Sequence, residues 1–543
     1  MKAYKSCVVF AGLLCVFMVS GCSREHSEKD GRKPVKQEVT MRIRDRVWTL
    51  DNDGVIDPNS RQIMGNVYEG LYRYDRNNHL KLAGAESVKS ENGGRTLTFR
   101  LRRNAKWSNG DPVTAGDYVY AWREMVNPKT GAPHGADLVM LKNAEAIRHG
   151  RMELDQLGVR ALDDYTLRVE LNSETPYFKE VLASLVALPK NRKVAEAQKD
   201  KYGTSSETAV FNGPFRPVGL SRTSDKWKLV RNDGYWDRKS VRLKTVRYVV
   251  VKSQAKAAQG VRDGKYDYAR IGAMYSRKLE RSRMFHSCLI PEITTVCFNS
   301  HRKVTGNVHF RRAVTYGIDR QKVAGIPNLH ARLLNGLVPQ RYSYNPQNDV
   351  DFRADAGNIL KYDRSLALRE WNEVKRETGL QNVTLTMLVT DRVSSFRQAE
   401  VIRSSLEKTL PGLRIIIRQV STGENLKRAF DYDYDLLYQS WQPFFVDPLA
   451  FLLDGGMEHL RDDYHNTDFW NCIYDATGRY AADFNTRRRR LIKAEDIMIG
   501  QDAFVAPVCQ LRNGYMLNPK VRDVSFDSCS SCYNLRNAWV AGK

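Results

Sequence analysis

The sequence lacks the local signatures that would mark an enzyme or a membrane-spanning protein. It has no HExxH, GxSxG or P-loop pattern, which are the signatures of metalloproteases, serine hydrolases and nucleotide-binding proteins. After its N-terminal region it has no apolar run long enough to cross a bilayer. It also has no fixed-period repeat and no linker rich in proline, glycine and serine. These absences favour a globular protein whose domains are built from discontinuous segments.

Acidic residues are fewer than basic ones: 62 aspartates and glutamates stand against 86 lysines and arginines, for a formal net charge of +24. Such an excess can indicate nucleic acid, an anionic membrane or acidic ligands as partners. The basic residues are spread along the chain, however, and no nucleic-acid-binding signature accompanies them. We therefore expect a solvated basic surface and no nucleic-acid partner. The arginine run 487–490 is predicted to be one exposed turn at the start of a helix.

Cysteine is also scarce, with nine residues in 543. Cys7 and Cys15 lie in the apolar N-terminal run, and Cys22 follows it. Six further cysteines permit disulfides in an exported chain without defining their pairing, namely Cys288, Cys297, Cys472, Cys509, Cys529 and Cys532. The CxxC at 529–532 has no second pair at the spacing of a four-cysteine zinc site, so we expect a local disulfide or two free thiols there and no metal.

The N-terminus has the pattern of an export signal. Two lysines, at positions 2 and 5, precede an apolar run of about 13 residues, which is too short to span a bilayer as a helix. The run ends in Val19-Ser20-Gly21-Cys22, which resembles the lipobox of bacterial lipoproteins. We expect a signal peptide over 1–21, lipidation of Cys22 and a polar tether over 22–39. The mature chain would then be extracytoplasmic, in the periplasm or at the cell surface, and anchored to a bacterial membrane.

Local patterns predict an α/β protein of two or three domains with a parallel or mixed sheet in its second half. Alternating apolar residues predict a strand over 95–101, and the segment 159–171 is typical of a β-hairpin. Thr114, with Asp117 three residues later, predicts a capped helix. Predicted strands over 385–390 and 413–420 flank a predicted helix over 395–410, which together make a β-α-β unit.

A series of short motifs follows these elements in a fixed order. The longest reads LTFRLRRNAKWSNGDPVTAGDYVYAW, and others are Ile56-Asp57-Pro58, Tyr68-Glu69-Gly70-Leu71, Asn212-Gly213-Pro214-Phe215 and Phe310-Arg311-Arg312-Ala313-Val314. This order resembles family 5 of the bacterial extracellular solute-binding proteins, the oligopeptide- and dipeptide-binding group. The resemblance covers nearly the whole chain from about Asp57 onward.

The resemblance implies a periplasmic-binding-protein-like α/β fold (type II, cluster C) with two lobes, mixed sheets and an extra inserted domain. Lobe I would comprise 40–70, 194–271 and 486–543, the inserted domain 71–193, and lobe II 272–485. The ligand would lie between the lobes, which close by a hinge motion. It further implies a monomer that needs no cofactor, captures peptides and delivers them to the permease subunits of an ABC transporter.

The family binds its ligand with a stretch that matches residues 435–448 here. Trp441 and Asp447 fit the pattern, but Phe444 stands where the family has the aspartate that clamps a peptide's α-ammonium. Three explanations are open: another carboxylate such as Asp447 replaces it, the ligand has no free amine, or the register differs by a few residues. Ser440 and Gln442, the neighbours of Trp441, are also candidate ligand-binding residues.

Three further ligand-binding residues are predicted outside that stretch. His134 falls where the family has a pocket tyrosine, Arg428 is a candidate partner for a peptide carboxylate, and Gly272 begins the second lobe. The alternatives to an oligopeptide are another solute in the same fold (a murein tripeptide, a modified peptide, a nickel chelate or haem), a peptide hydrolase, or a structural lipoprotein that binds nothing.

Overall fold

A computed structural model describes residues 35–54, 57–76, 79–327, 329, 331–345, 347–443, 445–453, 463–526 and 533–542. The predicted signal peptide, Cys22, Phe444 and the pair Cys529 and Cys532 lie outside these residues. The chain divides into a first unit over Met1–Lys36 and a second over Gln37–Lys543, and all that follows concerns the second. Among the residues described, no helix combines the length and apolarity that a bilayer crossing requires.

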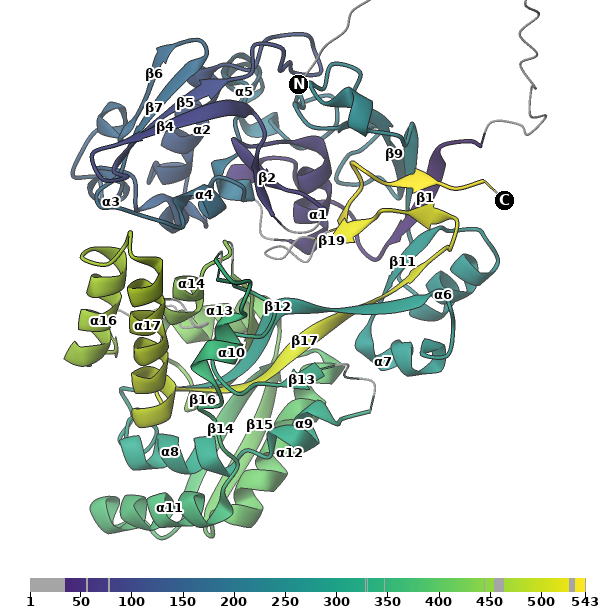
Figure 1. Ribbon diagram of the computed structural model, residues 1–543. Coiled ribbons are helices and arrows are strands. Elements are labelled where there is room, and N and C mark those ends of the chain that lie inside the picture. Colours follow the sequence, from purple (N-terminus) through teal and green to yellow (C-terminus); the bar gives the residue numbers. More distant parts are fainter. Residues whose placement is uncertain are drawn as a thin grey trace, which may run out of the picture. The chain divides into compact units, whose positions relative to one another are not determined.

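A mixed sheet of eleven strands runs through this unit in the order β15-β14-β16-β12-β17-β11-β1-β10-β9-β8, with β13 paired to β17 (Figure 1). β1 therefore pairs in parallel with both β10 and β11, although more than 200 residues separate them in sequence. The strands are β1 (Glu38–Ile43), β8 (Phe215–Val218), β9 (Lys226–Arg231), β10 (Thr245–Val250), β11 (Tyr268–Ile271), β12 (Phe285–Phe298), β13 (Ala331–Leu333), β14 (Val383–Thr390), β15 (Leu413–Val420), β16 (Leu436–Trp441) and β17 (Val505–Leu517).

The two longest strands, β12 and β17, join the two halves of this sheet. They are antiparallel neighbours over most of their length, and Figure 1 shows them side by side. The end of β17 also pairs with β11, whereas the end of β12 pairs with β16. Their register shifts between Leu289 and Ile293, where Pro291 has no N–H to offer the ladder. The interruption lies where the partner strands change.

A separate four-stranded sheet lies within residues 71–193, in the order β4 (Ala85–Glu91), β5 (Thr96–Leu101), β7 (Thr166–Glu170) and β6 (Val159–Asp163). The predicted strand and hairpin are confirmed by β5 and by the antiparallel pair β6 and β7. Helix α2 (Ala115–Val126) packs against this sheet and begins with the predicted capping box, in which the Thr114 N–H donates to Asp117 Oδ2 over 2.9 Å.

The predicted β-α-β unit is also confirmed. β14 and β15 pair in parallel over their whole length, and α12 (Val393–Thr409) connects them. Apolar residues of α8 (Val308–Gly317), α11 (Arg364–Thr378) and α12 form one core with these strands, in which Phe310 and Trp371 are fully buried.

The remaining elements are shorter. The helices are α1 (Pro58–Val67), α3 (Ala144–Arg148), α4 (Phe178–Val181), α5 (Arg192–Gln198), α6 (Gln254–Arg262), α7 (Ala273–Ser276), α9 (Arg320–Ala324), α10 (Phe352–Ala356), α13 (Thr422–Phe430), α14 (Pro448–Leu453), α16 (Thr467–Thr477) and α17 (Phe484–Glu495). Three two-stranded sheets pair β2 (Tyr72–Tyr74) with β3 (Leu80–Leu82), β18 (Val521–Arg522) with β21 (Trp539–Val540), and β19 (Ser525–Phe526) with β20 (Tyr533–Asn534).

The two ends of this unit are joined directly. The side chain of Gln37 donates to the carbonyl of Val540 over 2.9 Å and accepts from its N–H over 3.0 Å. The Gln62 side chain makes a similar pair of bonds with the backbone of Tyr533. Segments from both termini therefore belong to the same packed structure.

One sequence-based prediction needs correction, and one open question is answered. The arginine run does begin a helix, α17, but Arg487 and Arg488 are only 4% and 6% exposed, so the prediction of an exposed turn is wrong for these two. Their guanidinium groups bind carboxylates, that of Arg487 the buried Asp447 and that of Arg488 the exposed Asp355. Of the six cysteines considered for disulfides, the four that the structure describes, Cys288, Cys297, Cys472 and Cys509, are free thiols.

Candidate ligand-binding site

A cavity of about 850 Å³ lies beside β12 and β17. Its volume is within the usual range of small-molecule sites, roughly 300–1,000 Å³. Residues from well-separated parts of the chain line it: Tyr74, His79, Leu80, Glu180, 287–291 of β12, 341–345, Asp349, Val446, Gln510 and Arg512 of β17, and Phe526. The cavity therefore lies between the segment 71–193, the two connecting strands and the segment 341–349.

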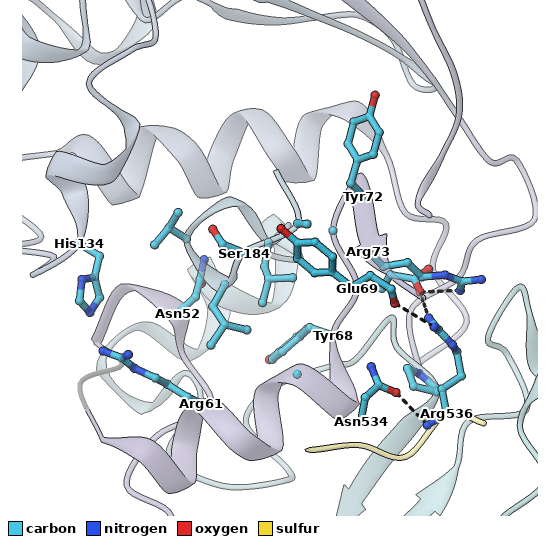
Figure 2. Close-up of a pocket in the computed structure, with 18 of the residues that line it drawn as sticks. Asn52, Arg61, Tyr68, Glu69, Tyr72, Arg73, His134, Ser184, Asn534 and Arg536 are labelled. Atoms are coloured by element: carbon cyan, nitrogen blue, oxygen red, sulfur yellow. Dashed lines mark hydrogen bonds and ion pairs between the residues drawn. The ribbon is translucent and has the colours of Figure 1, made fainter. Parts of the chain in front are cut away.

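A second cavity, of about 100 Å³, surrounds Tyr68 and Glu69 (Figure 2). Glu69 is buried and accepts hydrogen bonds from Tyr235, from Trp236 and from Arg73, the last over 3.0 Å. Arg536 adds an ion pair at 3.7 Å. Because this carboxylate is already neutralised and the space is small, we assign this cavity to the packing of the fold.

Glu180 is the half-buried carboxylate of the larger cavity. It lies on α4, and the Tyr74 hydroxyl donates a hydrogen bond to its Oε2. Partial removal from water raises the pKa of the Glu180 carboxyl to about 7, against the lowering effect of the Tyr74 hydrogen bond. A cation that enters the cavity would stabilise the charged form of this carboxylate.

Two guanidinium groups line the same cavity. Arg512 is half-buried on β17 and donates to the Ser287 carbonyl over 3.4 Å, whereas Arg341 is exposed. Tyr342, the neighbour of Arg341, donates its hydroxyl to the Phe445 carbonyl and accepts from the Asp447 N–H over 3.3 Å. The cavity wall thus carries charges of both signs, which suits a zwitterionic ligand.

Asp447 is engaged within the protein. Its two carboxylate oxygens accept from Nη1 and Nη2 of Arg487, each over 2.8 Å, and Oδ1 also accepts from the Leu449 N–H over 2.9 Å. Asp447 is 7% exposed and does not line the larger cavity, although Val446 does. A buried bidentate ion pair leaves this carboxylate little capacity to hold a ligand ammonium as well.

The other predicted ligand-binding residues lie outside the larger cavity. Ser440 and Trp441 pair with β12, and the Trp441 ring packs edge-on against Phe451 at 4.8 Å between centroids. Gln442 follows Trp441 and is half-buried. His134 lines the smaller cavity, with Nδ1 3.6 Å from Asp137 Oδ2.

Arg428 and Gly272 make contacts of a structural kind. Arg428 forms ion pairs with Asp433 at 2.9 Å and Glu424 at 3.6 Å, and both partners are local in sequence. The Gly272 N–H donates to the Gln254 side chain over 3.1 Å. Reasoning from the sequence missed Tyr74, Glu180, Arg341 and Arg512, because none of them belongs to a motif or a periodic pattern.

The fold and this cavity define a class: a two-lobed α/β solute-binding protein of the periplasmic-binding-protein-like type. The model for bacterial extracellular solute-binding proteins, family 5, matches residues 79–455, and the chain belongs to this family. Proteins of this family act outside the cytoplasm.

Similar proteins match over nearly the whole chain. The dipeptide-binding protein of Lactococcus lactis is 26% identical over 97% of this chain and 98% of its own. The oligopeptide-binding protein OppA of Bacillus subtilis is 27% identical over 98% of both. The crystal structure of the substrate-binding domain of an oligopeptide ABC transporter from Bacillus anthracis superposes with a TM-score of 0.80 at 32% identity, covering 94% of this chain and 99% of that one.

Proposed function

We propose that this protein captures peptides in the larger cavity and delivers them to the membrane subunits of an ABC importer. The proposal rests on the larger cavity, of about 850 Å³, which is lined by both the half-buried carboxylate of Glu180 and the guanidinium of Arg512. A peptide has an ammonium at one end and a carboxylate at the other, so it can satisfy both. Peptide binding by the similar proteins of Lactococcus and Bacillus supports the same conclusion.

The proposal also covers the oligomeric state, the absence of a cofactor and of catalysis, and the membrane anchor. The protein acts as a monomer without a cofactor, binds its ligand without turning it over, and is held at the membrane by lipid on Cys22. The Val19-Ser20-Gly21-Cys22 motif supports the anchor. Incorporation of labelled palmitate into the wild-type chain, and its loss in Cys22→Ser, tests this part separately.

Ligand binding is tested by thermal unfolding of the full chain, refolded from denaturant to remove carried ligand. The panel contains free di- to pentapeptides, the same peptides N-acetylated, and a murein tripeptide. A ligand at 100 times its Kd adds about 2.7 kcal/mol to the free energy of unfolding and raises Tm accordingly. A rise with free peptides supports the proposal, and no rise with any member of the panel refutes peptide binding.

The phenylalanine at position 444, where the family has its amine-binding aspartate, favours a second candidate function. This candidate has the same fold and binds a peptide-like ligand without a free amine. In that case the acetylated peptides stabilise the protein as well as the free ones do. Release of amino acids from any peptide would instead show that the protein is a peptide hydrolase.

A further inference from the structure

We infer that Glu180, supported by Tyr74, is the specificity-determining residue that holds the cationic amino group of the ligand. The inference rests on the proposed peptide-binding function and names the acceptor that this chain uses. It places the acceptor on α4, within residues 71–193, and not on the 435–448 stretch. The ligand class is therefore a peptide whose amino terminus is free and protonated.

Two positions of the 435–448 stretch could have held the ligand ammonium. Residue 444 is a phenylalanine, which offers no acceptor. Asp447 has a carboxylate, but both of its oxygens are bound by Arg487 at 2.8 Å. A ligand ammonium placed beside this pair would face a guanidinium as well as the carboxylate, so the net attraction there is small.

Among the residues that the structure describes, the carboxylates lining the larger cavity are Glu180 and Asp349. Asp349 is exposed, where solvent weakens an ion pair. Glu180 is half-buried, and within the described part of the chain it has no ion pair and one hydrogen bond, from Tyr74. The buried Glu69, by contrast, is paired with Arg73 and Arg536. Glu180 is thus a half-buried carboxylate of this cavity that can accept an ion pair from the ligand.

Ring contacts place Glu180 next to the stretch that lacks its aspartate. The Tyr177 ring stacks on Phe445, with centroids 5.1 Å apart and planes at 15°. Arg487 lies over the same tyrosine at 5.6 Å. Tyr177 is the N-cap of α4 and Glu180 lies three residues after it, so both belong to the same short helical segment. Val446 lines the cavity together with Glu180, so this residue of the stretch and the Glu180 carboxylate share one cavity.

The electrostatics of Glu180 agree with this geometry. Withdrawal from water, with a smaller contribution from the nearby charge of Asp447, raises the pKa of its carboxyl to about 7, against the lowering effects of the Tyr74 hydrogen bond and Lys179. An ammonium that binds there restores the charged form of the carboxylate. Because a half-buried ion pair is weakly screened, the ligand gains more from Glu180 than it would from an exposed acid.

The direct test is calorimetric titration of the full chain with one free tripeptide and with its N-acetylated form. For the free peptide, Glu180→Gln should raise Kd at least tenfold, because a charge-assisted hydrogen bond is lost. For the acetylated peptide, the variant should change Kd less than about twofold. Tyr74→Phe should give an intermediate loss, since it removes only the support of the carboxylate.

Asp349→Asn is the matched control, because it removes a carboxylate from the same cavity and should leave both Kd values within about twofold. If Asp349→Asn weakens free peptides and Glu180→Gln does not, the inference is overturned and the acceptor is Asp349. It is equally overturned if Glu180→Gln binds free peptide like the wild type. Wild-type protein that binds neither peptide refutes the proposed function itself, which separates the two failures.

A pH series gives a second readout. Free-peptide affinity of the wild type should fall as the pH drops from 8 to 5, since Glu180 becomes protonated, and Glu180→Gln should lose most of this dependence. The groups facing Glu180 are the Tyr74 hydroxyl, Tyr72, Lys179, and Asp447 with its Arg487, and His79 also lines the cavity. His79→Gln should therefore keep the pH dependence, and its loss in that variant would assign the titration to His79 and overturn the inference.

Discussion

At residue 447, a carboxylate of the presumed ligand-binding stretch is bound by an arginine of the same chain. Asp447 and Arg487 are both buried and form two hydrogen bonds of 2.8 Å. Arg487→Met leaves a buried carboxylate without its cation and should lower the free energy of unfolding by about 3–5 kcal/mol. The partly exposed pair Arg490 and Asp475, at 3.2 Å, is the control, and Arg490→Met should cost less than about 1 kcal/mol. Urea unfolding measures both, and equal effects would contradict the structural role of Arg487.

Glu180 also predicts how stability depends on pH without ligand. Its pKa is raised from 4.5 to about 7 in the fold, so the folded state binds more protons than the unfolded state between these values. The contribution of Glu180 to stability is therefore greatest below pH 4.5 and is lost as the pH rises through 7. Urea midpoints of wild type and Glu180→Gln should diverge over this range, with the variant gaining relative stability as the pH increases. A constant difference from pH 5 to pH 8 would contradict the raised pKa.

At the scale of one element, α2 depends on the carboxylate that caps it. Asp117 Oδ2 accepts from the Thr114 N–H over 2.9 Å and from the Trp107 indole over 3.0 Å, and both Asp117 and Trp107 are buried. Asp117→Ala removes the cap and leaves a buried indole donor unpaired, so the free energy of unfolding should fall by about 2–3 kcal/mol. Glu124→Ala, later on the same helix, should change it by less than about 1 kcal/mol. A loss below that of the Glu124 variant would show that the cap is dispensable.

Elements of this kind could be predicted from the sequence because their signals are local. The Thr114 and Asp117 box, the hairpin at 159–171 and the strand–helix–strand order at 383–420 each lie within a few dozen residues. The cavity could not be predicted in this way. Tyr74, Glu180 and Arg512 meet only after folding, and none carries a periodic or capping pattern. The burial of Arg487 was missed for the same reason, since a run of four arginines indicates a surface unless a distant carboxylate is known.

For the whole molecule, the shared strands predict cooperative unfolding. β12 and β17 pair with each other and with strands on both sides, so neither half of the eleven-stranded sheet keeps its hydrogen bonds if the other opens. Far-ultraviolet circular dichroism and tryptophan fluorescence should therefore give one urea midpoint. Two resolved transitions would show that the halves are independent folding units.

The position of β17 has a consequence for how such a chain leaves the cell interior. This strand is made of residues 505–517 yet lies in the middle of the sheet, and Val540, close to the C-terminus, bonds to Gln37 at the start of the same unit. A ribosome-bound or partly threaded polypeptide thus lacks its central strand and cannot settle into the native state. Because β17 comes from residues 505–517, the eleven-stranded sheet cannot form until these residues have left the ribosome or the pore.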